Sequence, residues 1–128
     1  MNNELRITKF TDLNTWKESH KLVLLIYSTT KHFPIDERFG LTDQIRRAVV
    51  SITSNIAEGF SRASYKEKSQ FYSMSLGSLS EVQNQTIIAR DLKYISSVEY
   101  NKIIELSIDV SKLLNGLIKK TKSIILNS

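Results

Sequence analysis

The sequence predicts an all-α protein, an antiparallel four-helix bundle with up-down-up-down order that forms a single domain over residues 1–128. Glycine and proline are scarce, with four Gly and one Pro, so the chain has few sharp turns. Apolar residues recur at helical spacing almost throughout. The connections between the four patterns are short, and short connections make successive helices antiparallel neighbours.

The first helix is expected over residues 13–31. Its core-facing stripe recurs every three or four positions, at Trp16, His20, Val23, Tyr27 and Thr30, and is widened by Leu22 and Ile26. Pro34 is predicted to end this helix, because the residue before a proline disfavours helical backbone.

The second helix is expected over residues 42–58. Thr42 is predicted to cap it with its hydroxyl, and Asp43 follows in the first turn, where the helix dipole favours negative charge. Gly59 is predicted to stop it, since glycine tolerates the left-handed backbone that often follows a helix. The apolar face is formed by Leu41, Ile45, Ala48, Val49, Ile52 and Ile56.

The third and fourth helices are expected over residues 65–93 and 98–125. Each opens with a capping box, first from Ser64 to Glu67 and then from Ser96 to Glu99. The third helix is rich in Ser, Gln and Asn, which favours a place at the centre of the bundle or at an interface between subunits. The small Gly77, with the serine after it, predicts close approach of a neighbouring helix. Residues 1–10 and 126–128 are expected to fray.

The amino-acid composition indicates the cellular compartment and excludes some kinds of site. The chain has no cysteine, which excludes disulfides and thiolate metal sites and favours a reducing cytoplasm. The first ten residues lack the apolar run of a signal peptide. The longest apolar runs, such as residues 22–27, are far shorter than the about 20 residues that span a bilayer, so no membrane association is expected.

No catalytic, metal or cofactor site is predicted, and we expect the protein not to be an enzyme. Bundles with a di-metal site need Glu-x-x-His on two helices, and neither His20 nor His32 follows a glutamate by three residues. Phosphate-binding and zinc-protease motifs are absent as well. His20 is interpreted as a packed or hydrogen-bonded core histidine.

Two pairs of polar residues lie on shared helix faces, and the first pair can be interpreted in two ways. Asn55 and Glu58 share a face of the second helix, and Ser78 and Glu81 share a face of the third. The first pair could form a polar pocket, but a structural network is favoured, in which Glu58 pairs with an arginine and Asn55 satisfies backbone groups, because a buried carboxylate persists only when paired.

The formal charge is +5, from 18 Lys and Arg against 13 Asp and Glu, which is compatible with nucleic acid or an acidic partner. The candidate nucleic-acid contacts are Arg46, Arg47, Lys119, Lys120 and Lys122. The adjacent arginines point about 100° apart on a helix, so one can face outward while the other leans toward a neighbouring element. The three lysines could instead complement the helix dipole or form a membrane-surface helix, the second being the weaker reading.

With these motifs the sequence resembles the bacterial four helix bundle protein family, which includes proteins encoded by intervening sequences inside 23S rRNA genes. It is also similar to the accessory variability proteins of diversity-generating retroelements. Thr53 departs from the family, which commonly has proline after Ser-Ile. The matching segments are 16–20, 26–27, 33–34, 39–42, 44–48, 51–52, 54–60, 76–79 with Glu81, and 114–118.

The resemblance implies a non-enzymatic bundle that assembles into a ring-like homopentamer. For the retroelement relatives it implies a basic surface that engages nucleic acid and a reverse transcriptase. The family motif positions carried over to this chain are Arg46, Arg47, Asn55, Glu58, Ser78 and Glu81. The leading hypothesis is an oligomeric protein that binds RNA, or another nucleic acid such as DNA, or a ribonucleoprotein. The alternative is a protein–protein interaction module or scaffold with no nucleic-acid role.

Overall fold

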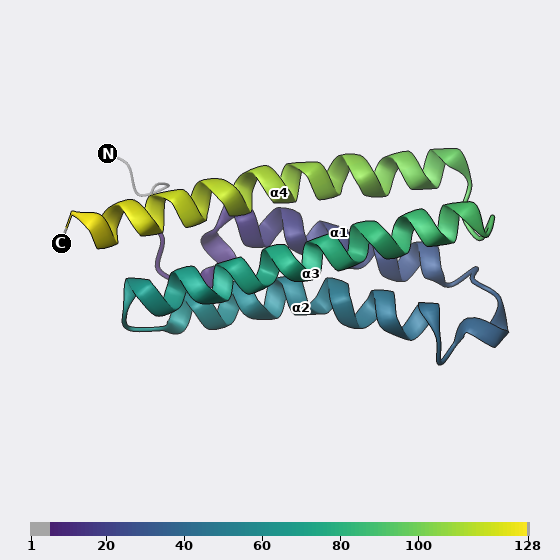
Figure 1. The fold of residues 1–128 in the computed structure, drawn as a ribbon, viewed down its shortest axis with the longest axis horizontal. Helices are drawn as coiled ribbons and strands as arrows, with labels where there is room; N and C mark the ends of the chain where they lie inside the picture. The colour runs from purple at the N-terminus through teal and green to yellow at the C-terminus, as the bar shows by residue number, and fades with distance from the viewer. Residues whose placement is uncertain (1–5, 128) are drawn as a thin grey trace.

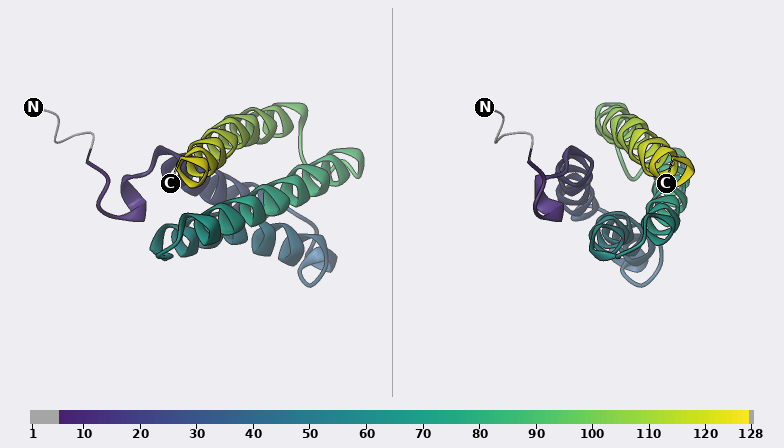
Figure 2. Two further views of the ribbon diagram at one scale, coloured as in Figure 1. Left: turned by 60° about the vertical axis from the view of Figure 1, so that its left-hand side comes forward. Right: turned by 90° about the vertical axis from the view of Figure 1, so that its left-hand side faces the viewer.

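The computed structural model describes residues 6–127, and the predicted all-α four-helix bundle is confirmed (Figure 1). Each helix packs against its neighbours in sequence, and α4 closes the ring onto α1 (Figure 2). The bounds differ from the predicted ones by less than one turn. The elements are η2 (Phe10–Asp12), α1 (Asn14–Thr30), η3 (Ile35–Glu37), α2 (Leu41–Ser61), α3 (Tyr65–Asp91) and α4 (Ser97–Leu126).

Two of these elements, the 3-10 turns η2 and η3, were not predicted. Pro34 lies beyond the end of α1 and directly before η3. The fraying expected at the termini falls partly on residues 1–5 and 128, which lie outside the described residues; α4 itself continues to Leu126. No helix in the described part of the chain has the length and apolar character needed to cross a membrane.

The predicted core-facing stripe of α1 is correct in part, since Leu22, Ile26 and Thr30 are buried and Trp16 and Val23 pack against the core. Leu22 and Ile26 are fully buried, whereas Trp16 and His20 are only half-buried and Tyr27 is exposed. The face that enters the core is completed by hydroxyl residues: Thr15, Ser19, Thr29 and Thr30.

The buried hydroxyls of Ser19 and Thr30 donate hydrogen bonds to backbone carbonyls of α1 itself. The Ser19 hydroxyl donates to the Thr15 carbonyl at 2.7 Å, and the Thr30 hydroxyl donates to the Ile26 carbonyl at 2.7 Å. Such internal bonding lets small polar side chains lie in a core without an unpaired donor. An apolar stripe alone therefore could not locate the whole of this face.

The start of α2 corrects the predicted Thr42 cap. Gly40 is the N-cap residue and provides no side chain, while the Thr42 hydroxyl is buried without a hydrogen-bond partner among the described residues. The backbone N–H of Leu41 donates instead to Glu37 Oε1 at 3.1 Å. A carboxylate four residues upstream thus replaces the expected cap.

Gly59 does not end α2, which corrects the predicted stop. The helix continues to Ser61, and Gly59 is buried against α3. A Cβ built on Gly59 would lie 2.9 Å from Phe71 Cβ and 2.9 Å from Tyr72 Cε1. Glycine is required here by the close crossing of α2 and α3 rather than by a turn.

Polar contacts join α2 and α3 near the middle of the bundle. The Ser51 and Ser78 hydroxyls lie 2.9 Å apart, and the buried Ser75 hydroxyl donates to the Ile52 carbonyl at 2.9 Å. The predicted close approach therefore occurs at the serines, whereas Gly77 is exposed and faces open space. Gln85 and Thr86 are also buried, so the polar side of α3 is partly central to the bundle.

The predicted capping box is complete at α4, whereas at α3 the serine cap is present without the reciprocal bond from the Ser64 backbone N–H to the Glu67 carboxylate. The Ser96 hydroxyl accepts from Glu99 N at 3.1 Å, and Ser96 N donates to the Glu99 carboxylate at 2.9 Å, which completes the box at α4. At α3 the Ser64 hydroxyl accepts from Glu67 N and donates to the Glu67 carboxylate, at 3.1 Å and 3.2 Å.

Candidate nucleic-acid interface

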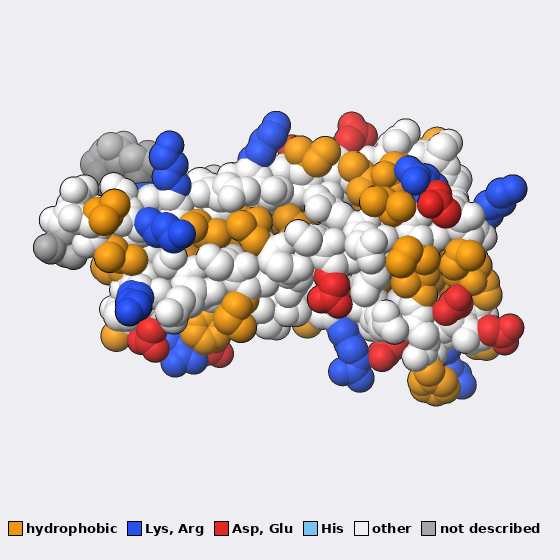
Figure 3. Space-filling model, in the orientation of Figure 1, with side chains coloured by type: hydrophobic (Ala, Val, Ile, Leu, Met, Phe, Trp, Pro, Cys, Tyr) orange, Lys and Arg blue, Asp and Glu red, His pale blue; other side chains and the backbone are white. Residues whose placement is uncertain are grey.

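Charge is distributed unevenly along the bundle. We call the end where α2 passes into α3 and α4 terminates the basic end; it comprises residues 6–21, 52–78 and 112–127. In Figure 3, Lys and Arg side chains lie over both halves of this face, whereas most of the Asp and Glu side chains lie over the right half, so positive charge is in excess on the left. The basic end carries eleven cationic residues, Arg6, Lys9, Lys17, Lys21, Arg62, Lys66, Lys68, Lys112, Lys119, Lys120 and Lys122, and four acidic ones, Asp12, Glu18, Glu58 and Glu67.

The opposite end is close to neutral. Within the described residues it comprises 22–51 and 79–111. Its seven cations are Lys31, Arg38, Arg46, Arg47, Arg90, Lys93 and Lys102; its eight acids are Asp36, Glu37, Asp43, Glu81, Asp91, Glu99, Glu105 and Asp109. The excess of positive charge is thus concentrated at one end, and the net charge of the protein does not reveal this asymmetry.

The three predicted lysines of α4 lie at the basic end. Lys119, Lys120 and Lys122 are exposed, and no described carboxylate lies within ion-pair distance of their ammonium groups. Lys119 and Lys122 border an open depression of about 630 Å³ that also reaches Leu126. Lys120 lies on another side of the helix, so the three charges surround the end of α4 rather than forming one row.

Lys120 borders a smaller cavity of about 250 Å³, which we call the end pocket. It lies at the basic end between the end of α2, the start of α3, the end of α4 and the segment before α1. Its walls are mostly apolar or aromatic. The lining residues are Ile7, Leu13, Phe60, Tyr65, Lys68, Tyr72, Leu117, Lys120, Thr121 and Ile124.

The side chain of Lys68 is fixed in this pocket. Its Nζ donates to the Phe60 carbonyl at 2.5 Å and lies 5.3 Å and 5.9 Å from the ring centroids of Phe60 and Tyr65. Burial lowers the pKa of Lys68. Burial, and secondarily the nearby Tyr65, raises the pKa of Tyr72 to about 12. The pocket therefore combines partly desolvated walls with cationic groups.

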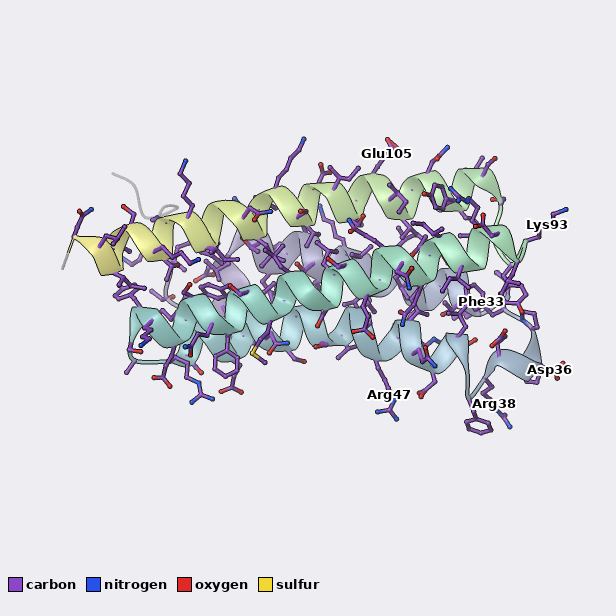
Figure 4. The ribbon with its side chains drawn as sticks, viewed as in Figure 1. Phe33, Asp36, Arg38, Arg47, Lys93 and Glu105 are labelled. Carbon is purple, nitrogen blue, oxygen red and sulfur yellow. The ribbon has the colours of Figure 1, made fainter. Side chains whose placement is uncertain are left out.

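The predicted arginines lie at the opposite end from the lysines. Arg46 leans on α1: its Nε donates to Thr30 Oγ1 at 2.8 Å, and its guanidinium lies 4.7 Å from the Tyr27 ring centroid. Arg47 forms an ion pair with Asp43 at 2.9 Å and points away from the bundle, as labelled in Figure 4. The two side chains diverge as their helical positions predict, but they do not join the lysines in one surface.

The four polar motif residues form local links rather than one pocket. Asn55 Nδ2 donates to the Ser51 carbonyl at 2.9 Å, and Ser78 shares a hydrogen bond with the same serine. Glu58 is exposed, not buried, and pairs with Arg62 at 3.0 Å. Glu81 is exposed and borders a depression on α2 together with Arg47.

No cluster of three or more histidine, aspartate or glutamate residues that could hold a metal ion occurs within residues 6–127. His20 stacks on Trp16 with 4.7 Å between ring centroids and an interplanar angle of 12°. This contact makes His20 a packing residue at the edge of the core.

Sequence reasoning missed the contribution of the α2–α3 connection. Phe60, Tyr65 and Lys68 stand about 50 to 60 positions before the α4 lysines, and only the fold brings them together. The alternation of aromatic and basic residues between Phe60 and Lys68 was a visible signal, since such interleaving is typical of nucleic-acid-binding surfaces.

Comparison with known proteins gives a family from one match and a fold from another. Residues 11–116 match the family model described as 23S rRNA-intervening sequence protein. The chain is also similar to a crystal structure of a protein of unknown function from the S23 ribosomal protein family of Bacteroides thetaiotaomicron. That similarity has a TM-score of 0.76 at 24% identity, covers 82% of this chain and 98% of that chain, and shows the fold alone. No curated protein matches this chain.

Proposed function

Because this chain belongs to the 23S rRNA-intervening sequence protein family, we propose that it is a non-enzymatic protein that binds RNA through its basic end. The observation that carries the proposal is the charge asymmetry, eleven cationic residues against four acidic ones at that end. A surface of one sign attracts a polyanion, and contacts between lysine or arginine and phosphate supply affinity without reading the sequence.

The lysines of α4 fit this role better than the arginines of α2. Lys119, Lys120 and Lys122 have no described carboxylate to compete with a phosphate. Arg47 pairs with Asp43, and Arg46 is held by Thr30 and Tyr27. We therefore expect the principal RNA contacts to be on α4.

We also expect the protein to act in the cytoplasm, since a chain without cysteine is compatible with a reducing compartment.

Filter binding with structured and single-stranded RNA, over a series of salt concentrations, tests the proposal. Affinity should fall steeply as salt increases, because phosphate contacts release counterions. DNA strands of the same sequence serve as a parallel arm that shows whether the 2′-hydroxyl matters. Failure to bind any RNA at low salt would contradict the proposal.

The second candidate is a protein–protein interaction module, and exposed apolar side chains at the opposite end favour it. Phe39 is 84% exposed and Ile35 is 74% exposed, and Val98 at the start of α4 is exposed as well. Large apolar side chains that are this exposed are candidates for contact with a protein partner. A partner, including a reverse transcriptase, that co-purifies through nuclease treatment and high salt would support this candidate over RNA binding.

We also propose that the protein assembles with copies of itself, as a homopentamer by resemblance to its family. Light scattering on the purified protein, with and without nuclease, reports the number of subunits and any co-purified nucleic acid together. A monomer mass under both conditions would overturn the assembly and would leave RNA binding by the single chain open to the filter assay.

A further inference from the structure

We propose that the end pocket accepts one unpaired base of a single-stranded RNA, while the exposed lysines around it hold the flanking phosphates. This inference rests on the proposed function and specifies the form of RNA that is bound. It is carried by three features of the same site: the size of the cavity, the rings in its walls and the charge at its mouth.

The size of the end pocket selects a small planar group. At about 250 Å³ it lies below the roughly 300–1,000 Å³ of pockets that hold drug-sized ligands. It can take a single base but not a whole folded oligonucleotide. Its walls are mainly apolar, so a phosphate alone would contact few of the lining side chains favourably, whereas a base can pack against them.

The rings in the wall suit base stacking. Tyr65 is the first residue of α3 and remains 45% exposed, so its ring is accessible from solvent. Phe60 lines the same cavity from the end of α2. Stacking of a base on an aromatic side chain is tolerant of base identity and is a common feature of proteins that bind single strands.

The charge at the mouth suits the backbone of a single strand. Lys120 is exposed at the rim, and Lys68 is held within the pocket by the Phe60 carbonyl. Lys66 adds a further exposed cation beside Tyr65. A base stacked on the exposed ring of Tyr65 would carry phosphates on either side, which the exposed ammonium groups of Lys66 and Lys120 can contact. A duplex keeps its bases stacked inside and cannot use the pocket in this way.

The test compares two short single-stranded RNAs of equal charge, one with ordinary bases and one with abasic sites at its centre, on the full-length protein. The wild type should bind the abasic strand roughly tenfold more weakly, since stacking is removed but the phosphates remain. Tyr65→Ala should weaken binding of the base-containing strand by a similar factor and leave the abasic strand unchanged. Tyr65→Phe, which keeps the ring, should bind like the wild type.

Phe39→Ala is the matched control, because it removes an exposed ring from the opposite end. It should bind both strands like the wild type, and thermal melting checks that each variant is folded. If both strands bind equally and Tyr65→Ala has no effect, the base pocket is overturned while RNA binding through the basic end stands. If neither strand binds, the proposed function fails and the pocket fails with it. Equal reductions in affinity for Tyr65→Ala and Phe39→Ala would also overturn the assignment.

Discussion

Tyr94 donates its hydroxyl to Glu37, with 2.8 Å between Oη and Oε2, and thereby ties the α3–α4 connection to the α1–α2 connection. The other carboxylate oxygen of Glu37 accepts from the backbone N–H of Leu41 at the start of α2. The Tyr94 ring also packs against Phe33, with 5.5 Å between centroids. One carboxylate thus holds three segments together at the end of the bundle opposite the basic end.

This arrangement predicts a specific loss of stability in acid. The Leu41 backbone hydrogen bond, followed by that of Tyr94, holds the pKa of Glu37 below its ordinary 4.5. A carboxylate whose pKa is lowered by folding stabilises the protein above its unfolded pKa, and this contribution disappears as pH falls through the folded pKa. We therefore expect the melting temperature of the wild type to fall as pH decreases below 4.5.

The melting temperature of Glu37→Gln should decrease less than that of the wild type as the pH falls, because the glutamine side chain has no charge to lose. Asp36→Asn is the matched control, since it removes a neighbouring exposed carboxylate and should follow the wild-type curve. Melting temperatures measured from pH 7 to pH 3 on the three proteins provide the comparison. Parallel curves for Glu37→Gln and the wild type would show that this carboxylate contributes nothing to acid stability.

Gly59 and Gly77 should respond in opposite directions to alanine. Gly59→Ala places a methyl 2.9 Å from the side chains of Phe71 and Tyr72, so α2 and α3 must separate, and overpacking of this kind costs about 1–3 kcal/mol. Gly77→Ala meets no atom within 4 Å and should stabilise the helix by about 0.5–1 kcal/mol. Denaturant unfolding measures both, and a Gly59→Ala variant as stable as the wild type would refute the close crossing.

Lys93 offers a stabilising change. It has φ 63°, the left-handed region, in the turn that ends α3. Lys93 N donates to Arg90 O and Tyr94 N donates to Ala89 O, each at 2.9 Å, which is the pattern of a Schellman turn. Glycine adopts this backbone without the Cβ clash, so Lys93→Gly should raise the free energy of unfolding by about 0.5–1 kcal/mol.

Lys93→Ala separates the backbone effect from the removal of charge. It removes the same ammonium but keeps a Cβ, so it should not reproduce the gain of Lys93→Gly. Chemical unfolding of the two variants and the wild type at one pH gives the comparison. An equal gain in both variants would assign the effect to charge rather than to the left-handed backbone.

The fold was predictable from the sequence because its signals are local. Helical periodicity and the capping serines before α3 and α4 depend on residues within one or two turns. The errors arose where a distant contact decided the outcome. Glycine is a common residue at helix ends, but Gly59 lies inside α2 because it packs closely against the rings of α3. At the start of α2, the carboxylate of Glu37 accepts from the backbone N–H of Leu41 in place of the expected cap by the Thr42 hydroxyl.

The candidate site was predictable only in part, for the same reason. Lys119, Lys120 and Lys122 fall within four consecutive residues and form a visible cluster. Arg46 and Arg47 lie apart from these lysines, because α2 and α4 run in the same direction and the start of α2 and the end of α4 are therefore at opposite ends of the bundle (Figure 1). The same topology brings the α2–α3 connection to the end of α4, and net charge carries no information about either effect.

Two triple variants of equal charge should separate the two ends of the bundle. Replacing Lys119, Lys120 and Lys122 with Gln should leave folding intact, because all three are exposed and have no described ion-pair partner. It should weaken binding of single-stranded RNA and reduce the slope of log affinity against log salt by about 0.7 for each phosphate that is no longer neutralised. Replacing Lys31, Arg47 and Lys102 with Gln removes the same charge from the opposite end and should leave that slope unchanged. Equal reductions in both variants, measured by filter binding over the same salt series, would show that RNA responds to the net charge of the protein and not to its basic end.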